Sequence, residues 1–188
     1  ILCTGYLGEK IEEYFGNGKK MGIHIKYSKE NEPLGTGGAL KNAEKLLENE
    51  FVLIYGDSFL DMDYNALIAD FNKSKKLAKT VVFKNNPKIV LNNMEVLKTG
   101  KVLHYDKKNE GRSNYVEAGV HIFKKDFLDV MPKNSAFSLE EELLPILIKK
   151  RELLAGHGGL CLIPALWDDS GRRITWGQEF ETSLANMV

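Results

Sequence analysis

The spacing of apolar and polar positions predicts alternating strands and helices over most of the chain. Residues 51–55 form a continuous apolar run, which is typical of a strand buried on both faces of a sheet. Tyr64, Leu67 and Phe71 recur at helical spacing and predict the inward face of a helix. The same criteria predict strands at residues 1–4, 23–27, 80–83, 95–97, 102–105 and 115–123, and helices at residues 9–15, 39–47 and 138–150.

Polar residues predict where two of these helices begin. Asp63 precedes the helix that contains Tyr64 and can accept a hydrogen bond from its first turn. Ser138 and Glu141 have the spacing of a capping box at the start of the last helix. Pro145 lies inside that helix and predicts either a kink or a fresh helix start.

The order of strands and helices predicts an α/β fold built on an open sheet. Such sheets bind ligands beyond the carboxyl ends of their strands. Two segments are therefore candidates for a site. One is a glycine-rich stretch before the helix at residues 39–47, and the other is the pair Gly56 and Asp57 after the apolar run.

The glycine-rich stretch comprises Leu34, Gly35, Thr36, Gly37 and Gly38. We expect a loop here, because three glycines in four residues let another group approach the backbone closely, and the following helix offers N–H donors. These features suit a phosphate, a ribose or the edge of a base, although a tight turn with positive φ would have the same sequence. The stretch lacks the residues of a P-loop and the spacing of a dinucleotide-binding loop.

Acidic residues near strand ends are the other candidates. Asp57 could hold Mg²⁺ together with substrate phosphates, or could cap a turn. Asp61 and Asp63 superficially match the Asp-x-Asp of metal-dependent glycosyltransferases, although Asp63 is better explained as a helix cap. Glu117 and Gly119 interrupt a predicted strand, where Glu117 could accept hydrogen bonds from sugar hydroxyls or could face outward.

Composition narrows the class of protein. The 188 residues carry 26 basic and 26 acidic side chains, and this net charge of zero is untypical of a general nucleic-acid binder. No apolar run approaches about 18 residues, so no membrane span is predicted. Two cysteines are too few for a disulfide framework, which favours a reducing, cytoplasmic location. Every lysine lies at or before Lys150, and this shift predicts a boundary near residue 155.

Taken together, these residues resemble the sugar-1-phosphate nucleotidyltransferase family. The resemblance covers residues 1–154 and is carried, in order, by PLGTGGAL, YGDSFLD, YVEAGVHIF and FSLEEELLP. The first two motifs are specific as a pair, whereas neither is specific alone. The bacterial branch that activates mannose or heptose 1-phosphate as guanylyltransferases is the most similar.

The resemblance implies a Rossmann-like, GT-A-like open mixed sheet and a reaction of an NTP with a sugar 1-phosphate that gives an NDP-sugar and pyrophosphate. It implies these roles: nucleotide binding for residues 34–38 and Gly56, Mg²⁺ binding and catalysis for Asp57, sugar binding for Glu117 and Gly119, and phosphate binding and catalysis for Lys107. Such chemistry depends mainly on positioning and charge neutralisation. The resemblance specifies no oligomeric state.

Two departures from the family pattern lead us to expect little turnover. The family opens with a strand, a glycine-rich loop with an Arg, and a Pro-Lys-Pro segment, and this chain starts at what would be the following strand. Residues 155–188 resemble a translated Alu-type repeat, and Asp168 and Asp169 fall by coincidence near the family's second metal ligand. We therefore expect a partial domain at residues 1–154 and an unrelated, poorly ordered tail at residues 155–188.

Two other functions stay open at this point. A non-catalytic sugar-nucleotide-binding or regulatory homologue would keep Lys107, Glu117 and Gly119 and would bind without turnover. A GT-A glycosyltransferase would use Asp61 and Asp63 at its metal, and this requires Asp63 to point into a cleft.

Overall fold

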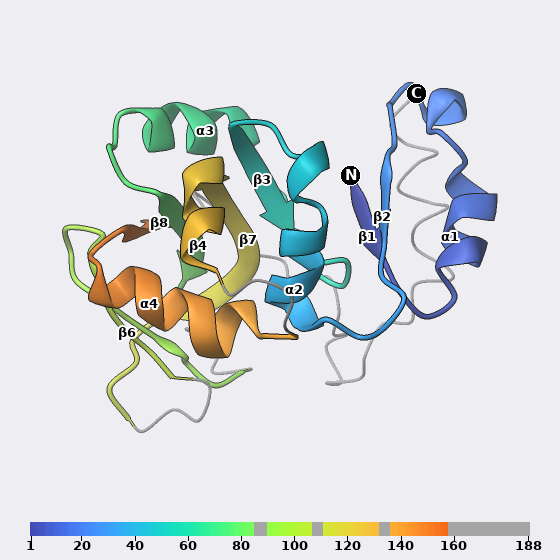
Figure 1. The fold of residues 1–188 in the computed structure, drawn as a ribbon. Coiled ribbons are helices and arrows are strands. Elements are labelled where there is room, and N and C mark those ends of the chain that lie inside the picture. The colour runs from blue at the N-terminus through green and yellow to red at the C-terminus, as the bar shows by residue number, and fades with distance from the viewer. Residues whose placement is uncertain (85–89, 107–110, 132–135, 158–188) are drawn as a thin grey trace.

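The structure is a computed structural model that describes residues 1–84, 90–106, 111–131 and 136–157, and these form a mixed α/β fold (Figure 1). The strands are β1 (Leu2–Thr4), β2 (Tyr27–Lys29), β3 (Glu50–Ile54), β4 (Ala78–Phe83), β5 (Met94–Val96), β6 (Val102–Tyr105), β7 (Val116–Lys124) and β8 (Leu153–His157). The helices are α1 (Gly8–Phe15), α2 (Gly35–Asn42), α3 (Tyr64–Asn72) and α4 (Leu144–Lys149), with short helical turns η1 (Lys19–Met21), η2 (Glu44–Leu46), η3 (Lys125–Val130) and η4 (Leu139–Leu143). None of the helices in these ranges has the length and apolar character that a membrane span requires.

The central sheet is open and mixed, with strand order β3-β7-β4-β8. Strand β7 runs antiparallel to both β3 and β4, whereas β8 runs parallel to β4. Both faces of β3 contact apolar clusters, Phe51 and Leu53 on one side and Val52 on the other. The strand is less buried than residues 51–55 predicted, since Ile54 is 45% exposed. Within the described ranges β3 pairs with β7 alone. The buried centre is the nine-residue β7, which has a neighbouring strand on each side.

The two faces of β7 pack into separate apolar clusters, because successive side chains of a strand point to opposite faces. Val120 and Ile122 pack with Phe71 of α3 in one cluster. Phe123 belongs to the larger cluster, which includes residues of η3, η4, α4 and β8. The ring of His121 stacks on Phe123, so this histidine lies on the same side of the sheet as η4.

A short parallel pair of strands, β1 and β2, forms its own sheet and contacts α2. It lies beside α1, at the side of the molecule nearest β3 (Figure 1). The strand predicted at residues 23–27 is mostly wrong, because β2 begins only at Tyr27. Ile25 donates its backbone N–H to the carbonyl of Asn17 at 3.0 Å, which holds this segment against the turn after α1.

The helix predicted at residues 138–150 forms in two parts. Ser138 accepts a hydrogen bond from the N–H of Glu141 at 3.1 Å, which confirms the predicted cap. Its own N–H donates to Glu142 at 2.9 Å, one residue later than in a capping box, because the first turn is the wider π type. Pro145 then stands in the first turn of α4, so it marks a fresh helix start.

The last described strand crosses the boundary predicted near residue 155. Ala155 lies opposite Thr80 in the parallel pairing of β8 with β4. Its N–H donates to the carbonyl of Gly100 at 2.7 Å, which ties β8 to the turn between β5 and β6. Residues 158–188 lie outside the described part, so the division into a domain and a tail stays a prediction.

Candidate functional site

The glycine-rich stretch begins a helix instead of forming the expected loop. Helix α2 starts at Gly35, whose φ of +71° is one that glycine adopts without strain. The N–H groups of Gly37 and Gly38 both donate to the carbonyl of Phe137, at 3.0 and 3.4 Å. The donors expected at this helix N-terminus are therefore partly used by the chain itself.

Close contact with Phe137 explains why glycine is needed in this stretch. A Cβ at Gly37 would lie 2.3 Å from the Phe137 ring, and a Cβ at Gly35 would lie 2.6 Å from the Phe137 carbonyl oxygen. Leu34 extends the contact, because its carbonyl accepts the N–H of Phe137 at 3.0 Å. The group that approaches the backbone here is thus another part of the same chain.

Gly56 and Asp57 lie on an exposed turn directly after β3. The N–H of Ser58 donates to the carbonyl of Tyr55 at 3.0 Å and closes the turn. The position at the end of a central-sheet strand is the one predicted. Because Asp57 is exposed, its carboxylate is accessible to a ligand.

Asp63 serves as a helix cap, as its position before the helix predicted. Its carboxylate accepts a hydrogen bond from the N–H of Ala66 at 3.0 Å, at the start of α3. This contact uses the side chain that a metal-binding Asp-x-Asp pair with Asp61 would require. The geometry therefore counts against a glycosyltransferase metal site at these two residues.

Glu117 and Gly119 lie at an irregularity in β7, beside the turn that carries Asp57. The register between β7 and β4 shifts here, and Gly119 has a φ of +73°. The carbonyl of Gly119 accepts the N–H of Tyr55 at 3.0 Å, and a Cβ on Gly119 would lie only 2.4 Å from Oγ of Ser58. The antiparallel pairing of β3 and β7 thus brings two predicted parts of the site together.

The carboxyl group of Glu117 is held inside the protein, and only 6% of its side chain is exposed. Burial raises the pKa of Glu117 to about 7, although the N–H of Gly119, which donates to Oε1, opposes this shift and the charge of Glu140 adds to it. Asn93 fixes the backbone by accepting the N–H of Glu117 at 2.8 Å. Near neutral pH this carboxyl can therefore donate or accept a hydrogen bond.

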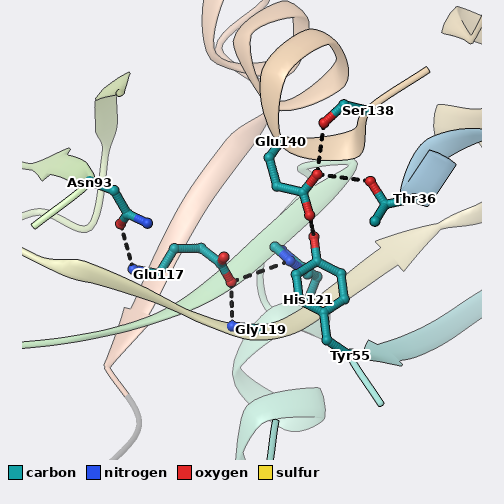
Figure 2. A network of polar contacts seen from close by, with 8 residues as sticks. All are labelled: Thr36, Tyr55, Asn93, Glu117, Gly119, His121, Ser138 and Glu140. Atoms are coloured by element: carbon teal, nitrogen blue, oxygen red, sulfur yellow. Dashed lines mark hydrogen bonds and ion pairs between the residues drawn. The ribbon is translucent and has the colours of Figure 1, made fainter. Parts of the chain in front are cut away.

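His121 belongs to this site, although the sequence does not single it out. The ring is fully buried, and its Nε2 lies 3.3 Å from Oε1 of Glu117 (Figure 2). Within the described part of the chain neither ring nitrogen has a hydrogen-bond partner. Burial lowers the pKa of His121 to about 4, against the opposing charge of Glu140, so the ring is neutral at physiological pH. Its spacing from Glu117 along one strand is the available sequence signal.

Glu140 joins hydroxyl groups from three separate segments (Figure 2). Its Oε2 accepts hydrogen bonds from Thr36 and Ser138, both at 2.8 Å, and its Oε1 accepts one from the hydroxyl of Tyr55. Burial acts to raise the pKa of Glu140, but the hydrogen bonds outweigh it and lower the pKa. Burial and the bond to Glu140 raise the pKa of Tyr55, which keeps its hydroxyl a donor. The sequence marks Glu140 only as part of a helix start.

Several predicted residues lie outside the part of the chain that the structure describes. They are Lys107, Asp168 and Asp169. Among the described residues no group of three or more His, Cys, Asp or Glu side chains could hold a metal ion.

Comparisons with known proteins agree on one family. Residues 1–173 match the family model described as "Nucleotidyl transferase". The chain is 33% identical over 143 residues to D-glycero-alpha-D-manno-heptose 1-phosphate guanylyltransferase of Campylobacter jejuni. This alignment covers 76% of this chain and 62% of that relative. It is 28% identical over 151 residues to mannose-1-phosphate guanylyltransferase of Mycobacterium tuberculosis, and this alignment covers 79% of this chain and 42% of that relative.

A solved structure confirms the predicted fold class. The crystal structure of HddC from Yersinia pseudotuberculosis complexed with GMP-PN matches with a TM-score of 0.69 and 23% identity, over 83% of this chain and 68% of that one. The chain itself spans less than two-thirds of the length of the two curated relatives above.

Proposed function

Because this chain belongs to the nucleotidyl transferase family, we propose that the protein transfers a nucleotidyl group from an NTP to a sugar 1-phosphate. An oxygen of the sugar phosphate attacks the α-phosphorus, the bond from the α-phosphorus to the β-phosphate breaks, and pyrophosphate leaves. The observation that carries this proposal is that three distant segments meet at the end of β3. They are the glycine-rich start of α2, the turn with Asp57, and the irregular part of β7 with Glu117.

Each segment suits one part of the substrates. We assign the nucleotide to residues 34–38 and Gly56, because Gly35, Thr36 and Gly56 are exposed. We assign the sugar to Glu117 and Gly119, because a largely buried carboxyl in its ionised form can accept hydrogen bonds from sugar hydroxyls. The phosphate of the sugar is assigned to Lys107. The reaction needs no covalent nucleophile, since positioning and charge neutralisation supply most of the catalysis in phosphoryl transfer.

Asp57 is the residue that would hold Mg²⁺. Magnesium commonly uses one or two carboxylates together with waters and substrate phosphates, and an exposed Asp at a strand end fits that pattern. When bound, the ion neutralises negative charge on the phosphates. The residues of the chain then have the task of holding nucleotide and sugar phosphate in line.

One observation favours the second candidate, a non-catalytic sugar-nucleotide binder. The N–H groups of Gly37 and Gly38 are already bonded to Phe137, which leaves fewer donors for a triphosphate. On the sugar side, the contacts of the Glu117 carboxyl group with the described residues are to Gly119 and His121 of its own strand. Binding of NDP-sugars without turnover would support this candidate.

Two measurements on the purified chain test the proposal. Titration calorimetry with NDP-sugars measures binding, and pyrophosphate release with Mg²⁺, each NTP and mannose or heptose 1-phosphate measures turnover. We expect NDP-sugar binding that weakens about tenfold or more in Glu117→Ala, since a hydrogen-bonding carboxyl is lost.

Glu50→Ala is the matched control for this experiment. Glu50 is exposed at the start of β3, at the opposite end of the strand from Asp57, so its removal should leave binding unchanged. The proposal is wrong if the chain neither binds any NDP-sugar or NTP nor releases pyrophosphate. Rapid pyrophosphate release would support the proposal and contradict the expectation of little turnover.

A further inference from the structure

Glu140 occupies a place in the fold that the proposed function leaves without a role. One of its carboxylate oxygens accepts a hydrogen bond from Thr36, in the first turn of α2, at 2.8 Å. The other accepts a hydrogen bond from Tyr55, the residue directly before Gly56 and Asp57. A single side chain therefore contacts both the segment assigned to the nucleotide and the segment assigned to the metal (Figure 2).

Loss of Glu140 would affect its two neighbouring segments differently. On the α2 side, hydrogen bonds from backbone N–H groups also connect the two segments: Leu139 donates to Oγ1 of Thr36 at 2.9 Å, and Gly37 donates to the carbonyl of Phe137 at 3.0 Å. On the β3 side, the Tyr55 hydroxyl links the carboxylate of Glu140 to the turn. Loss of the Glu140 carboxylate would thus release the end of β3 from α2 while each segment keeps its own backbone bonds.

We infer that Glu140 is a positioning residue, whose carboxylate sets the spacing between the start of α2 and the turn that carries Asp57. This inference rests on the proposed function for its consequence, because those two segments are assigned to the nucleotide and to Mg²⁺. Phosphoryl transfer is sensitive to such spacing, since small misplacements of the reacting groups cost large factors in rate. A carboxylate suits the task because hydrogen bonds to a charged acceptor are shorter and stronger than neutral ones.

The first test measures hydrogen exchange in the unliganded chain and in Glu140→Gln. Glutamine keeps the size of the side chain but replaces one acceptor oxygen with a donor, so it cannot accept from both hydroxyls. We expect amides of residues 34–42 and 53–58 to exchange about tenfold faster, as for the loss of a hydrogen bond to a charged group. Tyr55→Phe removes only one hydroxyl and should speed exchange at residues 53–58 alone.

Glu142→Gln is the matched control. Glu142 lies on the same helical turn and accepts the N–H of Ser138 at 2.9 Å. The hydroxyls of Thr36 and Tyr55 bond to Glu140 instead. Its loss should change exchange only near residue 138. If Glu140→Gln gives the same local pattern as this control, the inference is overturned.

The second test measures the affinity for GTP with and without Mg²⁺. In the wild type we expect Mg²⁺ to increase the affinity for GTP. If Glu140 sets the spacing between the two segments, this increase should be about tenfold smaller in Glu140→Gln and in Tyr55→Phe. Glu142→Gln should leave this ratio unchanged. A purely structural role for Glu140 would weaken binding equally with and without Mg²⁺, and that result would overturn the inference.

The two tests separate the inference from the proposed function. If the wild-type chain binds no nucleotide, the proposed function fails, and the exchange experiment still decides whether Glu140 joins the two segments. If Glu140→Gln does not fold, Tyr55→Phe keeps the carboxylate and nearly the same buried volume, and it decides both tests.

Discussion

At the scale of single residues, the centre of the site is a carboxyl and an imidazole whose pKa values burial shifts in opposite directions. The pKa of Glu117 rises to about 7 and that of His121 falls to about 4. The raised pKa of Glu117 gives stability at low pH that is lost as the pH rises through about 7. The lowered pKa of His121 gives stability above about pH 6.5 that is lost as the pH falls through about 4. In the window between these values the two effects oppose each other.

His121→Phe should separate the two effects. The variant keeps an aromatic ring against Phe123 but removes two buried nitrogens that have no hydrogen-bond partner among the described residues. Between pH 7 and pH 4 the free energy of unfolding of the wild type should fall by about 3 kcal/mol more than that of the variant. Only the wild type must keep an imidazole neutral in that range. Urea unfolding of both proteins across this pH range measures the difference.

Glu117→Gln is the reciprocal control for this prediction. It removes the carboxyl that gains stability on acidification, so its unfolding free energy should fall more steeply toward pH 4 than that of the wild type. Parallel pH curves for wild type and His121→Phe would show that burial does not depress the pKa of His121.

The sequence predicts some of these site residues but not others. Glu117 and Gly119 stand out because they interrupt a strand pattern, and the structure places them beside Asp57. His121 does not stand out, because a histidine in an apolar strand has the same local sequence whether it packs in a core or beside a carboxyl. The structure shows that the ring meets the carboxyl of Glu117, four residues earlier in the same strand.

At the scale of elements, residues at helix starts are predicted well because capping depends on neighbours within one turn. Asp63 caps α3 and Ser138 caps the helical turn η4. The predicted capping box at residues 138–141 is only half formed, because the first turn of that helix is of the π type. The π turn shifts the reciprocal bond to Glu142, and the position of Pro145 then starts α4 anew.

The cap at α3 gives a prediction that also tests the glycosyltransferase alternative. Asp63→Ala should lower the free energy of unfolding by about 1 kcal/mol, whereas Asp63→Asn keeps an acceptor for the N–H of Ala66 and should change it by less than about 0.5 kcal/mol. Asp61→Ala, two positions earlier and exposed, should also have little effect on stability. Chemical denaturation of the three variants checks these values.

The same variants address metal binding at this element. If Asp61 and Asp63 formed a metal site, Asp61→Ala and Asp63→Asn would both weaken the binding of Mg²⁺ or Mn²⁺ measured by calorimetry. We expect neither to do so, because Asp63 is engaged as a cap. Loss of metal affinity in both variants would restore the Asp-x-Asp interpretation.

At the scale of the whole molecule, the sheet extends past the boundary that composition predicted. Leu153 and Ala155 of β8 are buried against the rest of the sheet, with 2% and 7% of their surfaces exposed. The change in lysine content near residue 155 reflects composition only, whereas the hydrogen bonds of β8 depend on the edge that β4 presents. The described fold therefore ends no earlier than residue 157.

We predict that a chain shortened to residues 1–157 unfolds with the same free energy as the full chain, within about 0.5 kcal/mol. Leu153→Ala in either chain should lower that free energy by about 2–4 kcal/mol, because the side chain is buried in the larger cluster. Urea unfolding of the four proteins measures both effects. A large loss of stability on shortening at residue 157 would show that the prediction of an unrelated tail is wrong.

The sequence by itself determined the local features of this protein: the order of most strands and helices before β8, two helix caps, the position of Asp57 after a strand, and the motifs of the nucleotidyl transferase family. Periodicity and capping depend on residues a few positions apart, so the chain specifies them locally. Only the tertiary structure decided that β7 is the central strand, and that Phe137 makes the glycines necessary. It also decided that Glu140 joins Thr36 to Tyr55. These contacts join residues far apart in the sequence, and they depend on strand order and register, which no local pattern encodes.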